Sequence, residues 1–107
     1  MEHDNLFALP EKAPEEIVEV LASGKGMRIE RIISYGQTSP QGFWYDQEQA
    51  EWVTVLEGEA EIIYASGKRV RLMKGDALLL PARQKHRVSY TSSPCIWLCV
   101  FGEIKEK

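Results

Sequence analysis

Two side chains with useful chemistry, Glu51 and His86, stand at the start of alternating apolar segments. Alternate side chains of an extended strand share a face, so Glu51 lies with Val53 and Val55, and His86 lies with Tyr90. A carboxylate and an imidazole are both ligands of divalent metal ions and polar anchors for small molecules. Each also has a plainer interpretation. Glu51 would then be a solvated strand end or a buried hydrogen-bonded carboxylate, and His86 a pocket histidine with satisfied hydrogen bonds.

The elements that must position these two residues are short strands. Turns built around Gly58, Gly67 and Gly75 separate the alternating apolar segments of the second half of the chain. About eight short strands at a spacing of ~8–12 residues predict an all-β sandwich or barrel. The predicted strands are Met27–Ser34, Phe43–Asp46, Trp52–Leu56, Ala60–Ala65, Arg69–Met73, Ala77–Leu80, Arg87–Thr91 and Ile96–Phe101.

The segment before the first of these strands predicts a short helix over about residues 14–22. Pro14 and the two glutamates after it suit a helix start, where acids favour the positive end of the helix dipole. Apolar residues at 17, 18 and 21 would give this helix one apolar side. Gly24 would end it.

Size and charge restrict the kinds of partner. The 107 residues predict one domain, and a net charge of −3 argues against a nucleic-acid partner, whose phosphates favour a basic face. No apolar run approaches the ~18 residues of a membrane span, so we expect no membrane partner. Cys95 and Cys99 would lie ~13 Å apart along one strand. A disulfide needs Cα atoms within roughly 7 Å, so reduced thiols and a cytoplasmic location are expected.

Two segments of the chain resemble the two sequence motifs of the cupin superfamily. The first motif ends in a glutamate followed by six residues and a glycine, and Glu51 and Gly58 have this spacing. The second motif contains a glycine, then a proline, then a histidine, which Gly75, Pro81 and His86 match in spacing. The resemblance implies a single cupin domain over residues 1–107, an antiparallel jelly-roll barrel with its core at about 27–101. Glu51 and His86 would then both point into the barrel mouth.

The chain also departs from the family pattern. The first motif normally carries His-x-His before the glutamate, and counting back from Glu51 places these positions on Tyr45 and Gln47, or on Trp44 and Asp46. Asp46 is a hard oxygen donor that could replace one histidine, although it could equally cap a turn. We therefore predict a metal site and a ligand pocket, with packing in the core or an interface as the plainer role of the aromatic residues. The predicted metal ligands are Asp46, Glu51 and His86, and the predicted ligand-binding residues are Trp44, Tyr45, Gln47 and Tyr90.

These residues support two functions. The first is a small-molecule-binding cupin, with one divalent metal ion (Mn, Fe, Zn or Ni) as an optional cofactor in the barrel mouth. The alternative is a metal-dependent dioxygenase, isomerase or lyase acting on a small polar substrate. The segment Ile96–Phe101 is apolar on both faces and needs cover on both, from the N-terminal helix or from a second subunit. A homodimer is therefore also predicted.

Overall fold

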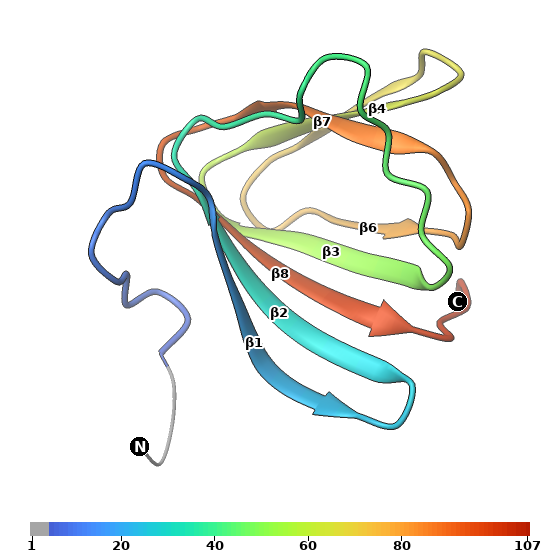
Figure 1. The fold of residues 1–107 in the computed structure, drawn as a ribbon, viewed down its shortest axis with the longest axis horizontal. Coiled ribbons are helices and arrows are strands. Elements are labelled where there is room, and N and C mark those ends of the chain that lie inside the picture. The colour runs from blue at the N-terminus through green and yellow to red at the C-terminus, as the bar shows by residue number, and fades with distance from the viewer. Residues whose placement is uncertain (1–4) are drawn as a thin grey trace.

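The computed structural model describes residues 5–107, which form two antiparallel β-sheets that face each other (Figure 1). One sheet has the strand order β1-β2-β8-β3-β6, and the other has the order β5-β4-β7. The antiparallel all-β class predicted from the sequence is confirmed. No helix that could cross a membrane occurs in residues 5–107. The strands are β1 (Ile17–Gly24), β2 (Met27–Ser34), β3 (Ala50–Glu57), β4 (Ala60–Tyr64), β5 (Arg69–Leu72), β6 (Ala77–Leu80), β7 (His86–Thr91) and β8 (Cys95–Gly102).

The helix predicted over about residues 14–22 is wrong, because this segment forms β1, an edge strand paired with β2. Three of its first four residues, Ile17, Val18 and Val20, are β-branched, and such side chains favour the pleated conformation over a helix. Gly26 has a φ of +70° in the tight turn that joins β1 to β2. The glycine-rich end of the segment is therefore a hairpin turn and not a helix cap.

The core lies between the two sheets. It is built from the inward faces of β3, β4 and β8, including Val55, Ile62 and Trp97, all at most 5% exposed. On the outward face of β8, Ile96 is buried and Leu98 is half-buried, so the strand is apolar on both sides as the sequence indicates. The homodimer that this pattern suggests stays a prediction.

The chain before β1 is fixed to the outside of the larger sheet by one arginine. The side chain of Arg31, on β2, is buried and pairs with Glu19 on the neighbouring strand. Its guanidinium also donates to the backbone carbonyls of Asn5, Leu6 and Ala8, at 3.3, 3.2 and 2.8 Å. The residues before β1 therefore have a defined place, which matters because Glu16, at the end of this segment, reaches the candidate site.

Candidate functional site

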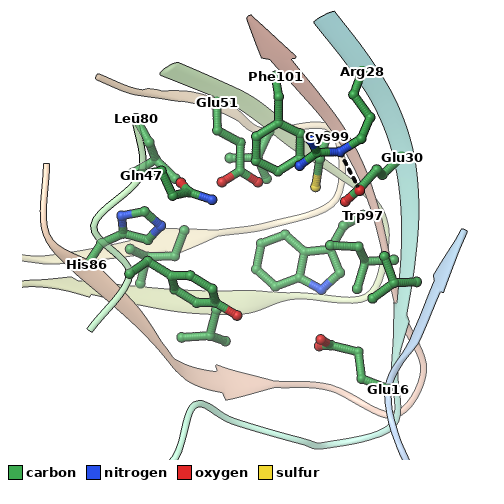
Figure 2. A pocket seen from close by; sticks show the side chains of 16 residues that line it. Glu16, Arg28, Glu30, Gln47, Glu51, Leu80, His86, Trp97, Cys99 and Phe101 are labelled. Atoms are coloured by element: carbon green, nitrogen blue, oxygen red, sulfur yellow. Dashed lines mark hydrogen bonds and ion pairs between the residues drawn. The ribbon is translucent and has the colours of Figure 1, made fainter. Parts of the chain in front are cut away.

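A cavity of about 260 Å³ opens between the two sheets, with apolar walls and polar side chains at its ends (Figure 2). Its volume is just below the ~300–1,000 Å³ usual for drug-sized ligands, so it suits a compact molecule. Four of the seven predicted site residues line it: Tyr45, Gln47, Glu51 and His86. The other lining residues are Glu16, Val18, Arg28, Glu30, Ile32, Val53, Ile62, Leu80, Val88, Trp97, Cys99 and Phe101.

His86 begins β7 and is only 4% exposed. Its backbone and that of Tyr45 exchange two hydrogen bonds, of 2.8 and 3.2 Å, and the two rings stack with their centres 5.2 Å apart. Nδ1 lies 2.8 Å from the carbonyl oxygen of Gln84, which can only accept, so Nδ1 carries the proton. Burial lowers the pKa of His86, although the hydrogen bond to Gln84 opposes this shift. The ring is thus neutral near pH 7, and Nε2 offers a lone pair.

Glu51, the second residue of β3, is 8% exposed and lies beside Gln47 in the cavity (Figure 2). Burial raises the pKa of its carboxyl, while hydrogen bonds with the side chains of Cys99 and Gln47 partly counter this. The pKa of the Cys99 thiol is itself raised, by burial and then by the charge of Glu51. Cys99 therefore remains a thiol and is not a thiolate nucleophile.

A charged pair lies on β2, on another side of the cavity. Arg28 Nε donates to Glu30 Oε2 over 2.6 Å, and the guanidinium carbon of Arg28 lies 4.2 Å from the centre of the Phe101 ring. The ion pair and the cation–π contact together hold the guanidinium in place. Most of its charge is thus already matched by Glu30.

Three predicted residues lie outside the cavity. Asp46 forms an ion pair with Arg83 at 3.2 Å on the surface, because the extended segment 44–47 alternates and turns only Tyr45 and Gln47 inward. Trp44, 38% exposed for the same reason, lies beside the guanidinium of Arg87.

Tyr90, the third of these residues, is 39% exposed, with the guanidinium carbon of Arg71 4.6 Å from its ring centre. The pairing of β4 with β7 shifts between Val88 and Tyr90, since Glu61 pairs with Tyr90 and the next residue, Ile62, pairs with Val88. This bulge leaves Ser89 as the extra residue and reverses the alternation beyond it. Strict alternation from His86 therefore assigns Tyr90 to the wrong face.

The donors around the cavity do not fit the predicted metal site. With Asp46 turned to Arg83, one carboxylate and one imidazole remain from the predicted set. Across residues 5–107, no three His, Cys, Asp or Glu side chains are grouped as a metal ion requires. The divalent ion stays a prediction, and none of the steps proposed below passes through it.

Several cavity residues were not expected from the sequence. Trp97, Cys99 and Phe101 share one face of β8, and that face lines the cavity, whereas the sequence indicates only a strand that is apolar on both faces. Glu30 shares one face of β2 with Arg28 and Ile32. Alternation alone does not show that this face lines the cavity, because that depends on the strand with which β2 pairs. Glu16 was assigned to a helix start, and the incorrect helix concealed its position.

The comparisons with known proteins agree with this architecture. The family model for the cupin domain matches residues 32–101, and the chain belongs to the cupin family. No curated protein is significantly similar to the chain.

Solved structures give the same fold. One, from Ralstonia eutropha, has the provisional name mannose-6-phosphate isomerase. It is 45% identical, with a TM-score of 0.90, over 97% of this chain and 100% of that one. A cupin superfamily protein from Desulfitobacterium hafniense is 17% identical, with a TM-score of 0.78, over 95% and 92% of the two chains. KdgF from a Halomonas species is 17% identical, with a TM-score of 0.72, over 90% and 87%.

Proposed function

We propose that this protein binds a compact, hydroxyl-rich molecule of the carbohydrate class in the cavity between its sheets. The observation that carries the proposal is Nε2 of His86. This atom belongs to a side chain that is 4% exposed, faces the cavity, and has no hydrogen-bond partner among residues 5–107. Nε2 offers its lone pair to the cavity, so a ligand hydroxyl that enters the cavity can donate a hydrogen bond to it.

The polar groups around Nε2 suit several hydroxyls at once. Gln47 brings an amide that both donates and accepts, and Glu51 brings a carboxyl whose raised pKa favours a form that also does both. Trp97 supplies a flat apolar surface near this polar end (Figure 2). An apolar wall with a few convergent polar groups is the usual form of a small-molecule site. The name of the similar Ralstonia protein independently supports a sugar-related ligand.

The test is an NMR titration of the intact protein with D-mannose and D-fructose. We expect the sugars to shift the indole N–H signal of Trp97 and the amide signals of β3 and β7. His86→Phe keeps an aromatic ring next to Tyr45 but removes both nitrogens, and it should weaken binding about fivefold or more, the usual value of one hydrogen bond. Tyr90→Phe, on the same strand but outside the cavity, should bind like the unmodified protein.

Three results would contradict the proposal: no binding of either sugar at millimolar concentration, shifts that map away from the cavity, or equal binding by the His86→Phe variant. A circular dichroism spectrum and a melting curve for each variant separate lost binding from lost folding.

A second candidate function is isomerisation of the bound molecule, supported by the name of the Ralstonia protein. Moving a carbonyl between neighbouring carbons requires a base for the C–H proton and an acid for the carbonyl oxygen. Nε2 of His86 and the carboxyl of Glu51 offer these two roles in one cavity. Loss of the C2 proton signal of D-mannose in heavy water during the same titration would support isomerisation. If this signal persists over days, the isomerase function is contradicted and only the binding function remains.

A further inference from the structure

Glu16, in the segment just before β1, directs its carboxylate into the cavity from the side opposite Gln47 and Glu51 (Figure 2). A chain of hydrogen bonds holds it. The indole N–H of Trp97 donates to Ser34 Oγ over 3.2 Å, and the Ser34 hydroxyl donates to Glu16 Oε2 over 2.8 Å. Ser34 is fully buried and out of reach of water, so its hydroxyl donates to the carboxylate of Glu16. Trp97 and Ser34, both in the core, thus fix the position of Glu16 at the mouth of the cavity.

The negative charge of Glu16 acts on the cavity. Burial is the main cause of the raised pKa values of Tyr45 and Cys99, which both line the cavity, and the charge of Glu16 adds to each shift, only slightly for Cys99. Within the described chain, residues 5–107, Glu16 forms no ion pair, and its carboxylate accepts a hydrogen bond from Ser34 alone. The other carboxylate oxygen is therefore available to a ligand.

The remaining charged and titratable groups of the cavity do not balance Glu16. Arg28 is matched by Glu30 at 2.6 Å, and burial keeps the imidazole of His86 neutral near pH 7. Any fraction of Glu51 that is ionised adds further negative charge. The cavity formed by the described residues thus carries a net negative charge whether Glu51 is protonated or not.

We propose that Glu16 is a specificity-determining residue that selects ligands presenting a hydroxyl or an ammonium donor at the cavity mouth and disfavours ligands presenting a phosphate there. This inference rests on the proposed function and narrows it to neutral or cationic carbohydrates. A sugar phosphate, by contrast, would meet the Glu16 carboxylate without an unpaired cation among the described residues that line the cavity to offset it. The provisional name of the Ralstonia protein predicts the opposite preference.

The experiment compares three probes that differ only at C6: D-mannose, 6-amino-6-deoxy-D-mannose and D-mannose 6-phosphate. Their dissociation constants are measured by NMR at about pH 6.5, well below the ordinary pKa of an alkyl amine, so that the amino sugar is charged. Three proteins are used: the unmodified chain, Glu16→Gln, and Glu15→Gln as a matched control. Glu15 is an exposed neighbour that does not line the cavity. Gln at position 16 can still accept the Ser34 hydrogen bond, so the fold and the cavity shape are retained.

The unmodified protein should bind the amino sugar most tightly and the phosphate most weakly. Glu16→Gln should weaken binding of the amino sugar about fivefold, the effect of one unit charge at ~4 Å in water-like surroundings, and should tighten the phosphate by a similar factor. D-Mannose should change little, and Glu15→Gln should change none of the three. Tighter binding of the phosphate than of mannose by the unmodified protein would overturn the inference, and so would equal effects of the two substitutions. If none of the probes binds the unmodified protein, the proposed function itself fails.

Discussion

Position 58, the last of the first family motif, requires glycine because of its backbone angle and because of its close neighbours. It lies in the turn between β3 and β4 with a φ of +82°. A Cβ atom there would stand 2.2 Å from Ser92 Oγ and 2.5 Å from the carbonyl oxygen of Pro94. Ser92 cannot simply rotate away, because its Oγ accepts from the Glu59 amide and donates to the Pro94 carbonyl, both over 2.9 Å. Gly58→Ala must therefore break contacts.

The expected cost follows from two contributions. Forcing a residue with a side chain into the left-handed region costs ~1–2 kcal/mol. Loss of the two Ser92 hydrogen bonds adds ~0.5–1.5 kcal/mol each. Gly67 has a φ of +95° in another turn, but a Cβ there meets no atom within 4 Å. Gly67→Ala therefore carries only the first contribution, so the two variants should differ by about 2 kcal/mol in the free energy of unfolding.

Urea unfolding followed by tryptophan fluorescence measures this difference directly. The gain from a stiffer unfolded chain is common to both glycine-to-alanine changes and cancels in the comparison. In thermal melts, Gly58→Ala should unfold roughly 10 °C below Gly67→Ala, given ~4–8 °C per kcal/mol for a domain of this size. Equal free energies of unfolding for the two variants would refute the reasoning, since Ser92 and Pro94 would then have moved without cost.

Two further predictions concern buried charge. Since burial raises the pKa of Glu51 in the folded state, the unmodified protein should lose stability as pH rises from the ordinary carboxyl pKa to the raised one. In urea unfolding at several pH values, Glu51→Gln should therefore be more stable than the unmodified protein above the raised pKa of Glu51. The two proteins should be equally stable at about pH 4, near the unperturbed carboxyl pKa. A difference in the free energy of unfolding that does not change with pH would contradict this. Arg31→Met should cost about 2 kcal/mol and speed amide exchange at Ala8, since it removes the donor to three carbonyls. Arg69→Met, which removes an exposed pair with Glu61, should cost little, and similar costs for both would argue against the role of Arg31.

The fold could be predicted because its signals are local. Glycine turns and alternating apolar residues specify strands wherever the turn is tight, as at Gly58 and Gly67. The helix prediction failed because residues 17, 18 and 21 fit a helical spacing as well as a strand, and the pairing partner that decides between them is not local. Pairing with β2 agrees with the preference of the β-branched residues Ile17, Val18 and Val20 for a strand.

The candidate site was predictable only in part. Glu51 and His86 follow from motif spacing, and both line the cavity. Tyr90 lies outside because a bulge at Ser89 reverses the alternation, and nothing in the strand's own residues marks that bulge. Glu16 is positioned by Ser34 and Trp97, which lie 18 and 81 residues further along the chain. Contacts of such sequence separation become visible only in the folded molecule.

The first motif also bears on whether this cavity suits hydrogen bonding or metal coordination. Counting back from Glu51 left two possible pairs of positions for the missing histidines, and alternation of exposure along residues 44–47 selects Tyr45 and Gln47. In place of two imidazoles the chain therefore carries a phenol and an amide, facing the retained Glu51 and His86. Phenol and amide groups donate and accept hydrogen bonds, whereas soft or borderline metal ions prefer imidazole. Burial also raises the pKa of Tyr45, which keeps its hydroxyl protonated and makes it a poor anionic ligand. The two substitutions thus support the proposal that the side chains of the cavity recognise ligand hydroxyl groups directly.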